Sequence, residues 1–285
     1  GGLAGPFLGG WLYEAVGFSL PYTMTSVMFG ICFAVVVSLC WLVPSSAHER
    51  LPQPTAIALP FLRRPPVIAV LATVVLLALP ISLAEPSFEP YLSAPPFSLG
   101  PGAVGTIFGI MALADLVGAL CSAPLARTLG QLPVMYLAPA VMIAAIMLLV
   151  HGPKRLFVVQ LAAVLFSFAL YPAFVVGSQL LLRIARTYDL DPREHSEVVA
   201  AAMMGSFSLA ICAGGMAGGA MLDHSGFEAT WSFGAYCIAP VPLVLFAGFH
   251  PAVIGRPLAP IASGAKGDDG GVGSRQIGGA GEKGR

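Results

Sequence analysis

Three carboxylates interrupt stretches of the sequence that are otherwise apolar. Glu85 and Glu89 lie in the apolar run 67–92, and Asp115 lies in the apolar run 102–124. A carboxylate inside a membrane-spanning helix costs about 2.5–3.5 kcal/mol on insertion scales, so such residues usually face a polar cavity. We therefore expect Glu85, Glu89 and Asp115 to bind a proton or a small cation.

The spacing of the first two acids places them on one face of a helix. Glu85 and Glu89 are four residues apart, which corresponds to neighbouring positions on the helix surface. Two carboxylates in a low-dielectric cavity resist joint ionisation, so one of them would hold a proton that a cationic amine can displace. The alternatives are that both acids are solvated at the outer end of the helix, and that Asp115 is a buried acid bonded to a neighbouring helix.

The amino-acid composition indicates which class of protein holds these acids. The chain is 57% hydrophobic and 10% charged, whereas a soluble domain carries roughly 25% charged residues. We therefore expect an all-α integral membrane protein whose main partner is the lipid bilayer. The net charge of zero gives no basic surface for nucleic acid. No metal-ligand spacing, phosphate-binding loop or nucleophile–base arrangement occurs, so neither a metal, a cofactor nor an enzyme is expected.

The apolar runs predict about eight transmembrane helices, each needing about 20 residues. We predict an incomplete span at 1–13, followed by full spans at 21–43, 67–92, 102–124, 133–150, 156–182, 196–222 and 228–250. The Gly-rich segment 251–285 has few apolar residues to bury and is predicted to be a disordered tail.

Lysine and arginine are distributed unevenly between alternate loops. The segments 44–66, 125–132 and 183–195, together with the tail, hold twelve of the fourteen, and the other loops hold only Lys154 and Arg155. Because positive charge accumulates on the cytoplasmic side, the first set is predicted to be cytosolic. The protein is thus expected to be a multi-pass membrane protein with a cytosolic tail, in a vesicular or plasma membrane.

One segment of the sequence occurs twice. Residues 5–18 read GPFLGGWLYEAVGF, and residues 214–227 read GGMAGGAMLDHSGF, with five identical positions. Five full spans separate the copies, so the repeat period is six helices and both copies cross in the same direction. Small residues let helices approach closely, which marks Gly5, Pro6, Gly9, Gly10, Gly214, Gly215, Gly218 and Gly219 as packing residues.

A six-plus-six parallel repeat with G-P-x-x-G-G near the outer end of a helix resembles the major facilitator superfamily and the antiporter motif of its drug:proton exchangers. Residues 5–22, with Leu-Tyr-Glu at 12–14, are similar to the vesicular amine transporters of that superfamily, and to the polyamine type in particular. Residues 83–86 resemble their L-E-P segment. Residues 118–130 resemble a degraded loop motif, with Ala126 where the family has an acid.

This resemblance covers residues 1–250 and implies a domain organisation. Residues 1–43 would be the last two helices of the N-terminal half, 44–66 the central cytosolic loop, 67–250 the C-terminal six-helix half and 251–285 the tail, with four helices expected upstream of residue 1. It implies proton-coupled antiport of a small organic cation, polyamine-like, with Glu85 binding substrate and proton and Asp115 assisting. The glycine motifs would form a seam that prevents proton leak. The alternative is a truncated, transport-inactive membrane protein or interaction partner.

Overall fold

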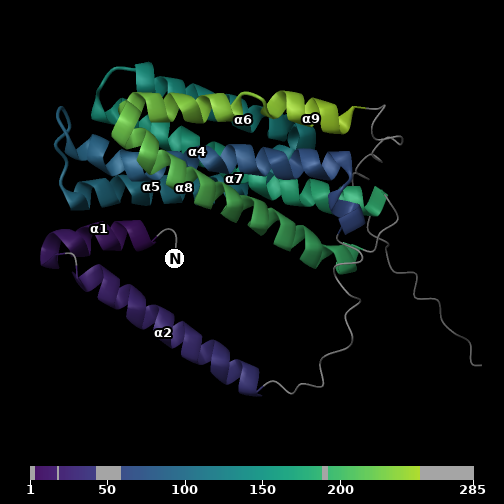
Figure 1. Cartoon of the computed structure of the whole chain (residues 1–285), viewed down its shortest axis with the longest axis horizontal. Coiled ribbons are helices and arrows are strands. Elements are labelled where there is room, and N and C mark those ends of the chain that lie inside the picture. The colour runs from purple at the N-terminus through teal and green to yellow at the C-terminus, as the bar shows by residue number, and fades with distance from the viewer. Residues whose placement is uncertain (1–3, 18, 43–58, 188–191, 251–285) are drawn as a thin grey trace, which may run out of the picture.

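The computed structural model describes residues 4–17, 19–42, 59–187 and 192–250, and within these ranges every regular element is a helix. Helices α4 to α9 form one bundle, α1 lies along α5, and α2 diverges from the bundle (Figure 1). The expectation of an all-α protein is confirmed for the described residues. The helices are α1 (Ala4–Val16), α2 (Ser19–Leu42), α4 (Pro65–Ser93), α5 (Pro101–Thr128), α6 (Gln131–His151), α7 (Leu156–Thr187), α8 (Pro192–Ile238) and α9 (Val241–Phe249).

Prolines begin two of the helices and lie inside several others. A proline opens both α4 and α5, where the missing N–H has no intrahelical partner to lose. The helices continue through Pro80, Pro86 and Pro90 in α4, Pro139 in α6 and Pro172 in α7. Neighbouring helices can satisfy the carbonyls that an internal proline releases, so such prolines are tolerated in membrane helices.

The chain reverses direction within α8, at Gly226. Gly226 adopts φ 78°, a left-handed conformation that favours glycine, and its flanking residues remain helical. Before it, Gly214 packs near Leu79 and Gly218 near Leu83; after it, Gly234 packs near Pro80. The prediction of two spans separated by a loop at 223–227 is therefore right about the reversal and wrong about the loop, because a single residue makes the turn.

The final predicted span, 228–250, is also interrupted. A turn at 239–240 separates the end of α8 from α9, and Pro240 precedes the first residue of α9. Pro242 then lies in the first turn of α9, where a proline is compatible with helix. The interruption follows from these two prolines, which lie too close together for an unbroken ladder of helical hydrogen bonds.

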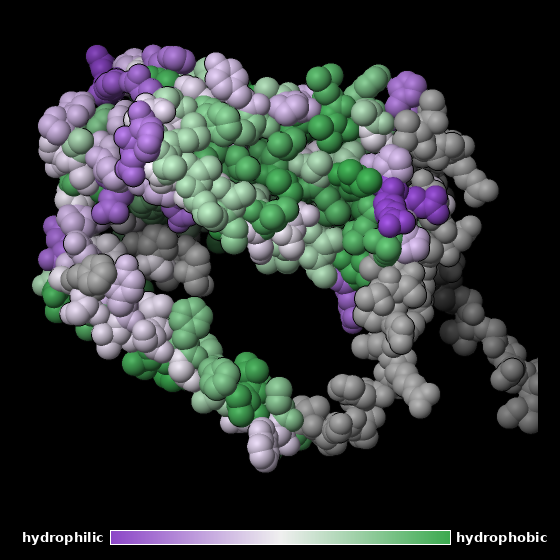
Figure 2. Space-filling model, viewed as in Figure 1, coloured by the Kyte–Doolittle hydropathy of each residue, from purple (hydrophilic) through white to green (hydrophobic). Residues whose placement is uncertain are grey.

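Six helices of the described chain are long and apolar enough to cross a membrane, the last being the run Ser196–Phe249. That run reverses at Gly226 and so accounts for two of the predicted spans. Helix α1, with 13 residues, is shorter than the roughly 20 that a span requires. Hydrophobic side chains form the middle of the bundle surface and hydrophilic ones gather at its ends (Figure 2). These features point to a multi-pass membrane protein.

Two of the predicted segments lie largely outside the described residues. Of the predicted central loop 44–66, only residues 59–66 are described: 59–62 form a helical turn and α4 begins at Pro65. The predicted tail 251–285 lies entirely outside the described part of the chain.

Candidate functional site

Two of the three predicted acids, the exposed Glu85 and the half-buried Asp115, line one cavity between helices of the bundle. Glu85 comes from α4 and Asp115 from α5, and both border a cavity of about 190 Å³. From α7, Ser167 and Tyr171 line the same cavity close to Asp115. Besides the two carboxyl groups, Ser167 and Tyr171 thus bring hydroxyl groups to the cavity.

Aromatic rings form most of the remaining wall of this cavity, namely Phe88, Phe108, Phe166, Phe207 and Trp231. Trp231 is 3% exposed, and its indole Nε1 donates a hydrogen bond of 3.1 Å to the hydroxyl of Ser87 on α4. The Trp231 ring centroid lies 5.6 Å from that of Phe166 and 5.8 Å from that of Phe88. Because the rings pack on each other and one is anchored by a hydrogen bond, the wall is held in a defined shape.

The chemistry of the cavity suits a positively charged organic group. A carboxylate attracts an ammonium ion, and aromatic faces attract cations at about 0.5–2 kcal/mol each. The volume of about 190 Å³ is below the roughly 300–1,000 Å³ of drug-sized sites. The cavity therefore fits the charged end of an amine. We call the cavity lined by Glu85 and Asp115 the inner cavity.

Glu89, the third predicted acid, does not line the inner cavity. It borders a separate cavity of about 500 Å³, together with Tyr13 of α1 and Tyr22 of α2. Four residues advance a helix by about 6 Å along its axis. Sharing a face with Glu85 is therefore not enough to bring Glu89 into the same cavity, because the neighbouring helices change over that distance. We call this second space the outer cavity.

The repeated glycines divide into close-packed and open positions. A Cβ on Gly218 would lie 2.6 Å from the Leu83 carbonyl oxygen of α4, and a Cβ on Gly10 would lie 2.8 Å from the Gly105 Cα of α5. Gly214 is also packed on α4, against Ser82 and 2.7 Å from the Leu79 carbonyl oxygen. No atom would lie within 4 Å of a Cβ at the other repeated glycines, Gly5, Gly9, Gly215 and Gly219.

The two copies of the motif thus use opposite members of the Gly-Gly pair. Gly9 is equivalent to Gly218 and Gly10 to Gly219, yet the packed residues are Gly10 and Gly218. The expectation of close helix packing holds for one glycine of each pair. The side chain of Pro6 lies outside the described part of the chain.

Glu14 of the repeated segment has a contact that sequence reasoning missed. Its Oε2 accepts a hydrogen bond of 2.8 Å from the backbone N–H of Gly102, in the first turn of α5. The first N–H groups of a helix lack intrahelical partners and carry partial positive charge, so a carboxylate there is stabilising. Glu14 therefore ties α1 to the beginning of α5.

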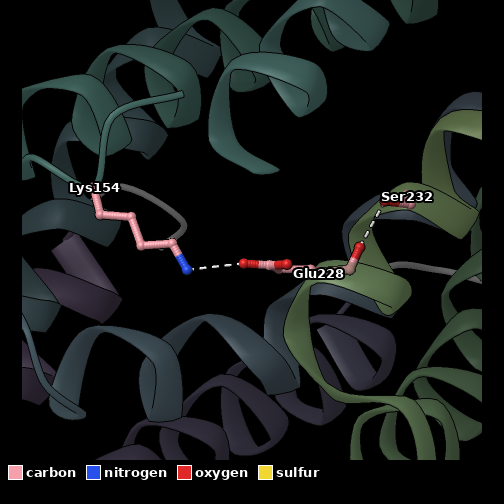
Figure 3. Close-up of polar contacts among 3 residues, drawn as sticks. All are labelled: Lys154, Glu228 and Ser232. Atoms are coloured by element: carbon pink, nitrogen blue, oxygen red, sulfur yellow. Dashed lines mark hydrogen bonds and ion pairs between the residues drawn. The ribbon is translucent and has the colours of Figure 1, made fainter. Parts of the chain in front are cut away.

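An ion pair joins two segments at the same end of the bundle. Lys154, in the loop between α6 and α7, donates a hydrogen bond of 2.8 Å to Glu228, just after the turn at Gly226 (Figure 3). Both side chains are more than half exposed, so the pair contributes little to stability. The hydrogen bond to Glu228 and its negative charge raise the pKa of the Lys154 amino group above its ordinary value.

Most of the aromatic wall was not predicted from the sequence. Tyr171 lines the inner cavity, and Ser167 lies four residues before it on the same face of α7. Tyr91 of α4 lies outside this wall and stacks on Phe227 with ring centroids 3.7 Å apart. Nothing in the local sequence distinguishes Phe88, Phe108 or Trp231 from aromatic residues that only fill the core.

No protein-family model and no curated protein matches the chain. The fold and the inner cavity describe the kind of protein. The described residues are all-helical and point to a multi-pass membrane protein, in which two carboxyl groups line an aromatic cavity.

Proposed function

We propose that the chain belongs to a proton-coupled secondary transporter of the major facilitator type, one that exchanges protons for a small, polyamine-like organic cation. The observation that carries this proposal is the inner cavity. Glu85 and Asp115 reach it from two different helices, and aromatic rings form most of the remaining wall. The six-helix period of the repeated glycine segment supports the superfamily assignment.

The two acids provide a means of coupling. In this proposal one compensating positive charge serves both carboxyl groups that border the inner cavity. That charge is supplied either by a proton on one carboxyl or by an ammonium group between them. Because both occupants neutralise the same charge, binding of the amine releases a proton and binding of a proton releases the amine.

The aromatic wall favours an organic cation over a bare metal ion. Hard metal cations require several oxygen ligands, whereas the inner cavity offers mainly ring faces beside its two carboxyl groups. In the part of the chain that the structure describes, no three Cys, His, Asp or Glu side chains come together as a metal site. The ring faces complement the methylene groups and diffuse charge of an alkylamine.

The close-packed glycines support the second part of the mechanism, a tight seam. Gly10 lets α1 approach α5, and Gly214 and Gly218 let α8 approach α4. Helices in contact along their backbones leave no room for a chain of water between them. In a transporter that moves its two halves alternately, such seams limit proton leak while the cation site changes its exposure.

Uptake into proteoliposomes with an acidic interior tests the proposal. Labelled spermidine is expected to accumulate with the wild-type protein and with Glu197→Gln, which changes an exposed acid of α8 away from the cavity. Glu85→Gln is expected to abolish accumulation, because it removes the carboxylate that we propose alternates between the proton and the amine. Unchanged uptake of every organic cation tested with Glu85→Gln would exclude Glu85 as the coupling residue.

A further inference from the structure

The outer cavity is larger than the inner one and has a wall of its own. Its volume is about 500 Å³, and residues from α1, α2, α4 and α5 line it. Its polar groups are the carboxylate of Glu89, the phenol groups of Tyr13 and Tyr22, and the hydroxyl of Thr25. The outer cavity thus resembles the inner cavity in chemistry, because both combine carboxyl groups with aromatic rings and hydroxyl groups.

The walls of the outer cavity are fixed by two contacts between α1 and α5. Gly10 lies directly against Gly105 and Pro101, so the two backbones touch beside the cavity. One turn further along α1, Glu14 accepts the hydrogen bond from Gly102. Two walls of the cavity, α1 and α5, are therefore packed directly on each other, and both Gly10 and Gly105 belong to its lining.

Glu89 gives this cavity its negative charge. Within the described residues no ion-pair partner is assigned to Glu89, and the Lys154 amino group is engaged with Glu228. A carboxylate attracts an ammonium ion, and the exposed side chain of Glu89 can be reached by one. Tyr13 and Tyr22 add ring faces that attract the same kind of ligand.

Phe108 connects the two cavities. It lines both the inner and the outer cavity, and its ring packs edge-on against Phe88 with centroids 5.7 Å apart. Glu89 lies one helical turn from Glu85 on α4. Phe108 therefore lies at the border between the cavity of Glu89 and the cavity of Glu85.

We infer that the outer cavity is a second binding subsite for an organic ammonium ion, in which Glu89 is the counter-ion and Phe108 separates it from the inner cavity. This inference rests on the proposed function for the direction of travel, but not for the binding itself. A cation is held first at Glu89, passes the Phe108 ring, and is then exchanged against a proton at Glu85 and Asp115. Phe108 is thus a specificity and gating residue between two sites.

Equilibrium binding of labelled spermidine to the purified protein tests the inference. Two binding components are expected for the wild type and for the control Glu197→Gln. Glu89→Gln is expected to weaken one component by about tenfold or more, because a charge-assisted bond to the ligand is lost. The double variant Glu85→Gln/Asp115→Asn is expected to weaken only the other.

The exchange rate of the ligand in Phe108→Ala is a second test, because this rate would not change if Phe108 had only a structural role. Removing the ring is expected to leave both components present and to accelerate ligand exchange at the inner component by about tenfold, as judged by stopped-flow release. Circular dichroism during heating verifies that each variant is folded. Two unchanged components in Glu89→Gln would overturn the second subsite. If the Glu89-dependent component is present and the Glu85-dependent one is absent from the wild type, the proposed function fails and the subsite stands.

Discussion

Neighbouring glycines in the second repeat predict opposite effects of the same substitution. A Cβ on Gly218 would lie 2.6 Å from the Leu83 carbonyl oxygen and 2.8 Å from the Leu83 Cα, whereas no atom would lie within 4 Å of a Cβ on Gly219. Contacts under about 3 Å with backbone atoms cannot be relieved by rotating a side chain. Helix α8 must therefore move away from α4 in Gly218→Ala.

The magnitude follows from the two environments. Overpacking of this kind typically costs about 1–3 kcal/mol. In Gly219→Ala no clash occurs, and replacing a helical glycine by alanine is favourable by up to about 1 kcal/mol. The free energies of unfolding of the two variants should thus differ by about 1–4 kcal/mol, with Gly218→Ala the less stable.

The assay is unfolding in mixed micelles with increasing SDS, followed by circular dichroism. The first repeat supplies a matched pair with the order reversed, since Gly10 is packed on α5 and Gly9 is open. Gly10→Ala should therefore destabilise more than Gly9→Ala. Equal destabilisation by Gly218→Ala and Gly219→Ala would refute the reasoning, because it would mean that the glycines act through general helix flexibility.

Three further predictions concern single contacts. Glu14→Gln should lower stability by about 0.3–1 kcal/mol, because it removes the charge at the start of α5, while Asp223→Asn at the exposed equivalent position should not; equal SDS unfolding curves for the two would contradict it. Glu228→Gln should return the raised pKa of Lys154 towards its ordinary value, measured by NMR of the methylated lysine. In the wild type the ion pair is present at neutral pH and is lost as the pH rises through the raised pKa of Lys154. A Lys154 titration that is unchanged in Glu228→Gln would be inconsistent with the pair. Trp231→Phe should lower the free energy of unfolding by about 0.5–1.5 kcal/mol, because the hydrogen bond to Ser87 is lost. Trp41→Phe, at an 87% exposed residue, should leave the free energy of unfolding unchanged. Equal SDS unfolding curves for the two variants would contradict this prediction.

The positions of the helices could be predicted because apolar length is a local property of the sequence. The predicted run 67–92 corresponds to Pro65–Ser93, and 102–124 to Pro101–Thr128. The turn at Gly226 was predicted as a five-residue loop because Asp223 and His224 are polar. Helix persists through them, since exposed backbone groups are costly near a bilayer and a single left-handed glycine completes the reversal.

The composition of the site could be predicted only in part. Glu85 and Asp115 stand out because charge is rare in apolar runs. Their aromatic neighbours do not, since Phe166 and Trp231 lie on α7 and α8, far along the sequence from Glu85 on α4, and reach the inner cavity only through helix packing. Similarly, the separation of Glu89 from Glu85 depends on where α1 and α2 lie, which no pattern within residues 65–93 specifies.

Proton release on cation binding tests the central claim most directly. In weakly buffered solution, addition of spermidine to the wild-type protein is predicted to release protons, recorded with a pH-indicator dye, because amine and proton compete for Glu85 and Asp115. Glu85→Gln/Asp115→Asn is predicted to release none, although it retains the Glu89-dependent binding. Binding of spermidine to the wild type without proton release, or the same release from the double variant, would contradict the assignment of these two acids as one cation and proton site.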